Sequence, residues 1–169
     1  MSITFIADSM LGTLAKWLRI LGYDTHYDPT LDDHQLVRLA RAEDRVLLTR
    51  DHELSRRRGV RALLIASQEL EAQLQQVVTD LALDPDHSFS RCPVCNEALE
   101  RLEYEQARAR VPAYVARTQR SFKICPVCQR IYWRGTHWQR MDKRLARLRS
   151  GDTPAETGGD ANTNPTLRR

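Results

Sequence analysis

The chain has 169 residues, enough for one ordinary domain and a small appended one, because single domains cluster near about 100 to 150 residues. Hydrophobic residues (41%) and charged residues (28%) occur in globular proportions around a net charge of +4. No apolar run approaches the roughly 18 residues of a bilayer span, and MSITFIADSM lacks the features of a secretory signal. We therefore expect a soluble, cytoplasmic protein.

Strand-like and helix-like stretches alternate over the first half of the chain. Apolar runs of strand length occur at ITFIA (3–7), VLLT (46–49) and ALLIA (62–66). We expect four helices: from after Ser9 to Gly22, from Asp33 as N-cap, from Asp51, and over about residues 68–83. The alternation predicts βαβ units, and thus an α/β fold with a mostly parallel sheet.

The first helix has an apolar face that is expected to pack in the core, formed by Leu11, Leu14, Ala15, Leu18 and Leu21. Lys16 and Arg19 lie off that stripe. They are expected either on a solvated face or beside the phosphate backbone of a bound ligand.

Three aspartates stand at the ends of these elements. Asp8 follows the first strand, Asp51 follows VLLT, and Asp33 opens the second helix. The carboxyl ends of parallel strands form one edge of a sheet, so we expect these carboxylates to converge there. Capping is the better explanation for each aspartate alone, but it leaves their clustering unexplained. Oxygen ligands favour Mg²⁺ or Mn²⁺, and such a site favours hydrolysis of phosphodiesters.

A linker near residue 88 is indicated by the stretch LDPDHSFS, and charge changes sign there. Residues 1–88 hold 10 Lys/Arg against 14 Asp/Glu, giving −4, and residues 89–169 hold 16 against 8, giving +8. This asymmetry fits an acidic part that binds cations joined to a basic part that binds a polyanion. It fits equally well a chance segregation of solvated charges. We expect domains at 1–88 and 89–149, with a basic helical stretch at its end, and a disordered tail at 150–169.

The four cysteines occur as two CPVC motifs, Cys92/Cys95 and Cys125/Cys128, separated by 29 residues. Two such pairs can close a tetrahedral thiolate site, which Zn²⁺ prefers. Redox pairs or disulfides are less consistent with a cytosolic chain and with motifs outside a βαβ unit. Four thiolates fill the coordination shell, so the zinc is expected to be structural, with a hairpin or longer excursion between the motifs.

Aromatic and basic residues are interleaved after the second CPVC motif: Tyr132, Trp133 and Trp138 with Arg130, Arg134, Arg140 and Lys143. They can stack on and neutralise a nucleic acid, or they can form the small core of a ribbon fold. His137 is expected to be a packing or surface residue.

Taken together, FIADSMLGTLAKWLRILGYDT, VLLTRDHEL, RCPVCN, CPVC and YWRGTHWQRM resemble the Mut7-C ribonuclease domain family over about residues 3–141. The resemblance implies a PIN-like α/β/α domain followed by a zinc ribbon, and a metal-dependent ribonuclease with Asp8, Asp33 and Asp51 as its acidic residues. It also implies products with a 5′-phosphate and a 3′-hydroxyl. PIN nucleases usually carry a fourth acidic residue, for which Asp32 and Glu53 are candidates by sequence proximity.

The sequence therefore predicts an RNA hydrolase in which Asp8, Asp33 and Asp51 hold Mg²⁺ or Mn²⁺, while Lys16 and Arg19 steady the RNA backbone. The alternative is an inactive PIN-like and zinc-ribbon adaptor that binds RNA or protein. A phosphate-transfer enzyme with an aspartyl nucleophile is a weaker alternative, because such enzymes place a second aspartate two residues after the first, where this chain has Met10.

Overall fold

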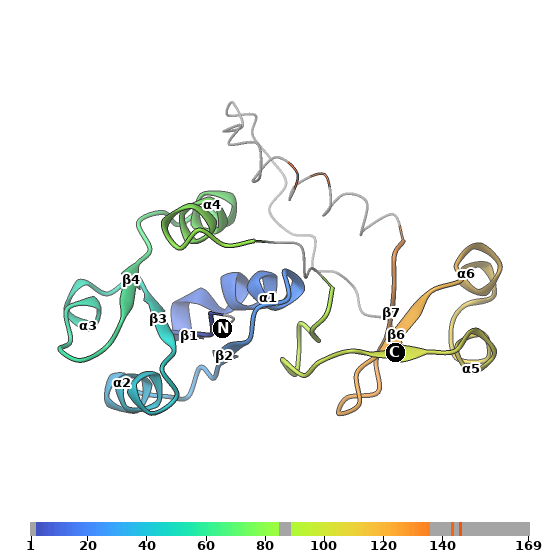
Figure 1. Ribbon diagram of the computed structural model, residues 1–169, viewed down its shortest axis with the longest axis horizontal. Helices are drawn as coiled ribbons and strands as arrows, with labels where there is room; N and C mark the ends of the chain where they lie inside the picture. Colours follow the sequence, from blue (N-terminus) through green and yellow to red (C-terminus); the bar gives the residue numbers. More distant parts are fainter. Residues whose placement is uncertain (1–2, 85–88, 136–142, 144–145, 147–169) are drawn as a thin grey trace. The chain divides into compact units, whose positions relative to one another are not determined.

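The structure of the protein is a computed structural model, and it describes residues 3–84, 89–135, 143 and 146 (Figure 1). The chain divides into two compact units, Met1–Ala98 and Leu99–Arg169. The first CPVC motif thus lies in the N-terminal unit and the second in the C-terminal unit.

The N-terminal unit contains a four-stranded, all-parallel sheet of order β2-β1-β3-β4, which confirms the predicted α/β class. Its elements in chain order are β1 (Phe5–Ala7), the 3-10 helix η1 (Ser9–Leu11), α1 (Gly12–Ile20), β2 (Thr25–Tyr27), α2 (Asp33–Ala42), β3 (Val46–Thr49), α3 (His52–Ser55), β4 (Ala62–Leu64) and α4 (Leu70–Asp80).

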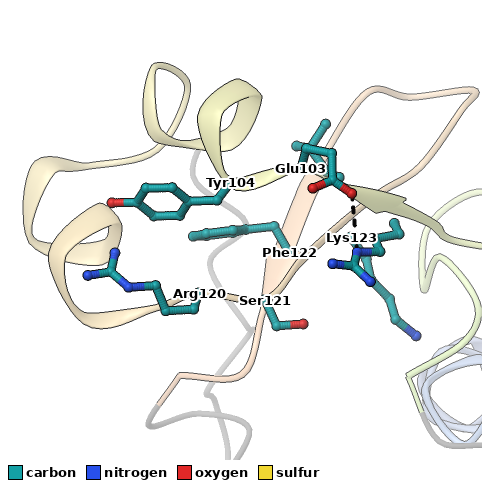
Figure 2. A pocket seen from close by; sticks show the side chains of 8 residues that line it. Glu103, Tyr104, Arg120, Ser121, Phe122 and Lys123 are labelled. Carbon is teal, nitrogen blue, oxygen red and sulfur yellow. Dashed lines mark ion pairs between the residues drawn. The ribbon is translucent and has the colours of Figure 1, made fainter.

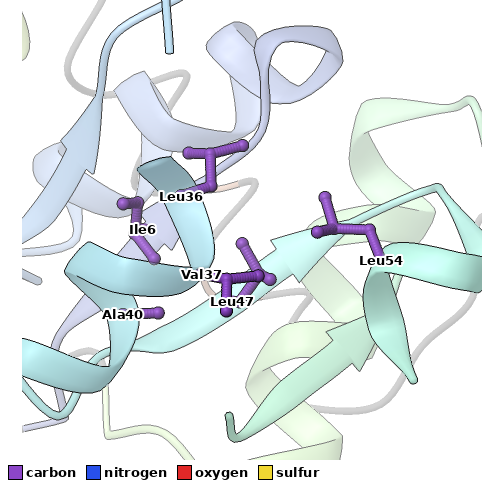
Figure 3. Close-up of a cluster of buried hydrophobic side chains, with 6 residues drawn as sticks. All are labelled: Ile6, Leu36, Val37, Ala40, Leu47 and Leu54. Carbon is purple, nitrogen blue, oxygen red and sulfur yellow. The ribbon is translucent and has the colours of Figure 1, made fainter. Parts of the chain in front are cut away.

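Helices cover both faces of this sheet. Helices α1 and α4 pack together on one face, and α2 lies across the other (Figure 1). Strand residues Ile6 and Leu47 point to the α2 face, where they join Leu36, Val37 and Leu54 in a buried cluster (Figure 3). Side chains of successive strand residues alternate between faces, so Phe5 points the other way and packs edge-on against Tyr23 at 5.8 Å.

Helix α1 follows the sequence expectation at its apolar face and at its end. All five predicted apolar positions, from Leu11 to Leu21, are buried. Gly22 adopts a φ of 94° and donates to the Arg19 carbonyl, while Tyr23 donates to the Leu18 carbonyl. These two bonds are a Schellman motif, which requires the left-handed conformation that glycine adopts without strain.

The predicted N-cap of α2 is wrong by one residue. Asp32 is the N-cap, because its carboxylate accepts the Gln35 N–H at 2.8 Å while the Gln35 side chain accepts the Asp32 N–H at 2.9 Å. This reciprocal capping box satisfies two of the otherwise unpaired helix N–H groups. Asp33 is the first helical residue, and its carboxylate is left for another role.

The C-terminal unit contains an antiparallel sheet of order β5-β6-β7. Its elements are β5 (Glu100–Leu102), α5 (Tyr104–Arg108), α6 (Ala113–Thr118), β6 (Phe122–Ile124) and β7 (Ile131–Trp133). Strands β5 and β6 and the two short helices fill the excursion between the CPVC motifs. They bury a separate core of Leu102, Ala107, Val115, Phe122 and Ile124.

None of the helices in the described part of the chain combines the length and the apolar character that crossing a membrane requires. The predicted tail at 150–169 lies outside the described residues, as does most of the basic stretch before it.

Candidate functional site

Two of the predicted aspartates follow neighbouring strands at the carboxyl edge of the parallel sheet. Ala7 of β1 lies opposite Leu48 of β3, and the Asp8 N–H continues the ladder by donating to the Leu48 carbonyl at 3.0 Å. Strand order reverses here, because β2 lies on one side of β1 and β3 on the other. In open parallel sheets this switch point is where ligands bind.

The Asp8 carboxylate is buried, with 6% of the residue exposed, and is held from both strand ends. Its Oδ1 accepts the Met10 N–H at 2.9 Å, which caps the 3-10 helix η1. Its Oδ2 accepts the Thr49 hydroxyl and the Arg50 N–H, the latter at 3.2 Å. These donors compensate the carboxylate for its loss of water and fix its orientation.

Thr49 connects the two aspartates, and the sequence did not identify it. It is fully buried; its hydroxyl donates to Asp8 and accepts the Asp51 N–H at 3.0 Å. A hydroxyl residue at the last position of an otherwise apolar strand, two residues before an aspartate, is the signal that could have found it.

Asp51 caps α3. Its Oδ1 accepts the N–H groups of Glu53 and Leu54 at 2.7 and 2.9 Å. The hydrogen bonds from Leu54 and Glu53 lower the pKa of Asp51 from its ordinary value of 3.8, so the side chain is a carboxylate at neutral pH. In the described part of the chain its Oδ2 accepts no hydrogen bond, and this oxygen can ligate a cation.

Asp33 is exposed at the start of α2, the helix that follows β2. Because β2 is parallel to β1, the start of α2 lies at the same edge as Asp8 and Asp51. The two candidates for a fourth acidic residue are also at helix starts: Asp32 caps α2, and Glu53 is exposed in the first turn of α3.

The three aspartates do not form a compact metal-binding group. Over the described residues, the group of three or more His, Cys, Asp and Glu side chains placed to hold one ion consists of the four cysteines. The predicted Mg²⁺ or Mn²⁺ site stays a prediction.

Arg19 does not occupy the solvated face considered for it, because only 7% of the residue is exposed. Its Nε donates to the Thr25 carbonyl at 2.9 Å, and its Nη1 donates to the carbonyls of Pro93 and Val94 at 3.1 and 2.9 Å. Burial lowers the pKa of Arg19, while the negative charges of Cys92, Asp24 and Cys95 oppose that shift. Lys16, one turn earlier, is partly buried.

The first CPVC motif is anchored on β2 by Asn96 as well. The Asn96 side chain accepts the Thr25 N–H at 3.0 Å and donates to Asp24 at 2.8 Å. Asp24 also pairs with Arg45 at 2.6 Å and with Arg91 at 3.7 Å. Arg19 and Asn96 together fix this motif to the sheet.

The two CPVC motifs have the same local geometry. In each, the first cysteine Sγ accepts the N–H of the second cysteine, at 3.4 Å in Cys92/Cys95 and 3.5 Å in Cys125/Cys128. The residue after each motif, Asn96 or Gln129, has positive φ and donates to the first cysteine carbonyl at 2.9 Å. These turns aim two sulfurs the same way.

The four sulfurs converge: the cysteines are not in disulfides, and their Sγ atoms lie within 4.8 Å of one another. Four thiolates at the Zn–S distance of about 2.3 Å are separated by about 3.8 Å in a tetrahedron, so the residues present fit a zinc ion.

The aromatic residues after the second motif belong to the core where the structure describes them. Tyr132 is buried, and Trp133 packs edge-on against Phe122 at 6.4 Å. The ribbon-core explanation therefore holds for these two. His137, Trp138 and Arg140 lie outside the described residues.

The comparisons with known proteins support the resemblance stated from the sequence motifs. No curated protein and no solved structure matches this chain. The family described as the Mut7-C RNAse domain matches residues 3–145, which include the parallel sheet, both CPVC motifs and all three aspartates. With most of its length matched, the chain belongs to the Mut7-C RNAse domain family.

Proposed function

We propose that the protein is a divalent-metal-dependent ribonuclease with a PIN-like N-terminal domain, and that its catalytic site is the carboxyl edge at Asp8, Asp33 and Asp51. The observation that carries the proposal is the buried Asp8 carboxylate at the switch point of the sheet, joined through the Thr49 hydroxyl to Asp51. Family membership supports a nuclease-type activity at this site.

The hydrogen bonds indicate which carboxylate oxygens would bind the cation. Asp8 Oδ2 accepts two hydrogen bonds, from Thr49 and Arg50, while Oδ1 accepts one, from Met10, so Asp8 would bind a cation through the remaining lone pair of Oδ1. Asp51 would offer Oδ2. Mg²⁺ or Mn²⁺ bound there would supply the charge that polarises a scissile phosphate and acidifies an attacking water. Asp33, which the Asp32 cap leaves unused, would complete the set from α2, and Lys16 would contact the RNA backbone.

The four cysteines are proposed to hold a structural Zn²⁺. A complete thiolate shell leaves no position for a reacting water, so the reaction is assigned to the aspartates. A cytoplasmic location, where thiols stay reduced, suits such a site.

The test is cleavage of end-labelled single-stranded RNA with Mg²⁺ or Mn²⁺. Asp8→Asn keeps the size of the side chain and removes its charge, so we expect no cleavage above a metal-free blank and an unchanged circular dichroism spectrum. Asp80→Asn is the matched control, because Asp80 is exposed at the far end of α4. Full activity in Asp8→Asn would refute the assignment.

An inactive adaptor is the second candidate. It is favoured by the finding that Asp8, Asp33 and Asp51 are not gathered into a metal-binding group among the described residues. An adaptor would bind RNA without cleaving it, and neither Mg²⁺ nor Mn²⁺ would change its affinity.

A further inference from the structure

The C-terminal unit has a hollow of about 300 Å³ at the end of β5 and the start of β6, which we call the basic hollow (Figure 2). Its lining residues belong to the segments 101–104 and 120–123. Three cations line it together with one carboxylate and two aromatic rings: Arg101, Arg120, Lys123, Glu103, Tyr104 and Phe122.

Positive charge is concentrated on one side of the basic hollow. Arg101 and Lys123 lie directly opposite each other on β5 and β6, an arrangement that is destabilising for like charges. Burial, together with the charge of Arg134, lowers the pKa of Lys123. Glu103 pairs with Arg101 at 3.3 Å, but both are exposed and such pairs are weak. An anion placed between Arg101 and Lys123 would be attracted by both side chains.

A cation–π contact between Arg120 and Tyr104 forms the other side. The Arg120 guanidinium carbon lies 4.7 Å from the centre of the Tyr104 ring, and the Tyr104 ring also packs against Phe122 at a centroid distance of 6.3 Å (Figure 2). Arg120 Nη1 and the Tyr104 hydroxyl both donate to the Ala116 carbonyl, at 3.0 and 2.8 Å. The guanidinium is thus held as a fixed, exposed plane.

We propose that the basic hollow binds single-stranded RNA, with a backbone phosphate between Arg101 and Lys123 and a base stacked on the Arg120–Tyr104 pair. Single-stranded RNA is recognised by stacking on aromatic rings and arginine planes together with phosphate contacts. An acidic peptide would use the cations but has no need of the fixed stack. The proposal deepens the proposed function, on which it rests for RNA as the ligand, and assigns RNA capture to the C-terminal unit.

Binding is measured by fluorescence anisotropy of a labelled RNA oligonucleotide, with zinc-loaded Asp8→Asn protein and no added Mg²⁺ or Mn²⁺, so that cleavage does not interfere. In Lys123→Met we expect weaker binding and a slope of log affinity against log salt that is smaller by about 0.7, the value for one phosphate contact on a single strand. The circular dichroism spectrum should stay unchanged.

Arg120→Lys separates stacking from charge. We expect the affinity for RNA to fall about 5-fold or more with an unchanged salt slope. The lysine keeps the positive charge but has no planar group on which a base can stack. Arg117→Met is the matched control: Arg117 is exposed on α6, one turn before Arg120 and outside the basic hollow, so its removal should leave affinity and slope as they were.

Wild-type affinity in both Lys123→Met and Arg120→Lys would overturn the proposal, as would equal competition by polyglutamate, which would make the basic hollow a peptide site. The two proposals fail separately. If the variants weaken RNA binding but the wild-type protein never cleaves RNA, the basic hollow stands and the nuclease function falls. If cleavage is metal-dependent and the variants bind normally, the reverse holds.

Discussion

Replacing the buried Arg19 by methionine tests how the first CPVC motif is held on the sheet. Methionine keeps most of the apolar stem and removes the three hydrogen bonds to the carbonyls of Thr25, Pro93 and Val94. At about 1.5 kcal/mol for each bond to a charged donor, the free energy of unfolding should fall by about 4.5 kcal/mol. Water does not replace these three hydrogen bonds, because only 7% of Arg19 is exposed.

The assay is urea unfolding of zinc-loaded protein, followed by circular dichroism and compared at equal m-value. Arg38→Met is the control, because Arg38 is exposed on α2 and its removal should change stability by no more than about 0.5 kcal/mol. A loss below about 1 kcal/mol in Arg19→Met would refute the reasoning. Stripping the zinc should also destabilise the wild type more than the variant, because Arg19 binds the backbone that the metal orders.

Three further changes test other parts of the molecule. Thr49→Val should cost about 1 to 3 kcal/mol of stability and raise the Mn²⁺ concentration needed for half-maximal cleavage, while Thr49→Ser should restore both; equal behaviour of the two variants would contradict this. Burial alone would raise the pKa of Asp24, but hydrogen bonds from Arg45 and Asn96 and the charges of Arg45 and Arg91 outweigh it, and the pKa is lowered. The stability that the lowered pKa contributes is present above the ordinary value of 3.8 and is lost as the pH falls below it. The urea concentration at the unfolding midpoint should therefore fall less steeply in Asp24→Asn than in the wild type between about pH 5 and about pH 3. Cys125→Ser should reduce the zinc content measured by atomic absorption, and unchanged zinc would remove the tetrathiolate assignment.

Local sequence patterns predicted a strand correctly where all of its residues are buried. VLLT is buried at every residue, and its predicted bounds are those of β3. Strand β2, by contrast, is the three-residue segment THY, with polar residues and no apolar run, and it exists because it pairs with β1. The hydrophobic pattern of the sequence therefore does not predict a strand such as β2, which forms because of its pairing with β1.

The sequence predicted the acidic residues of the candidate site, but not the residues that hold the site in place through hydrogen bonds. The spacing from Asp32 to Gln35 is that of a capping box, so the cap of α2 could have been assigned from sequence. Burial of Arg19 could not, because its acceptors lie 74 and 75 residues further along the chain. Thr49 owes its role to Asp8, 41 residues earlier, and a window along the chain does not bring the two together.

The hydrogen bonds at the ends of β1 and β3 run in one direction, from the Asp51 amide to the Thr49 hydroxyl and from that hydroxyl to Asp8. Because the hydroxyl oxygen accepts from Asp51, its own proton is turned toward Asp8, and each bond polarises the next. Opening of the chain at Thr49 and Arg50 therefore removes two of the three hydrogen bonds described for the Asp8 carboxylate and leaves the one from Met10. The rate at which the Asp51 amide exchanges with deuterium thus reports how firmly the Asp8 side chain is held.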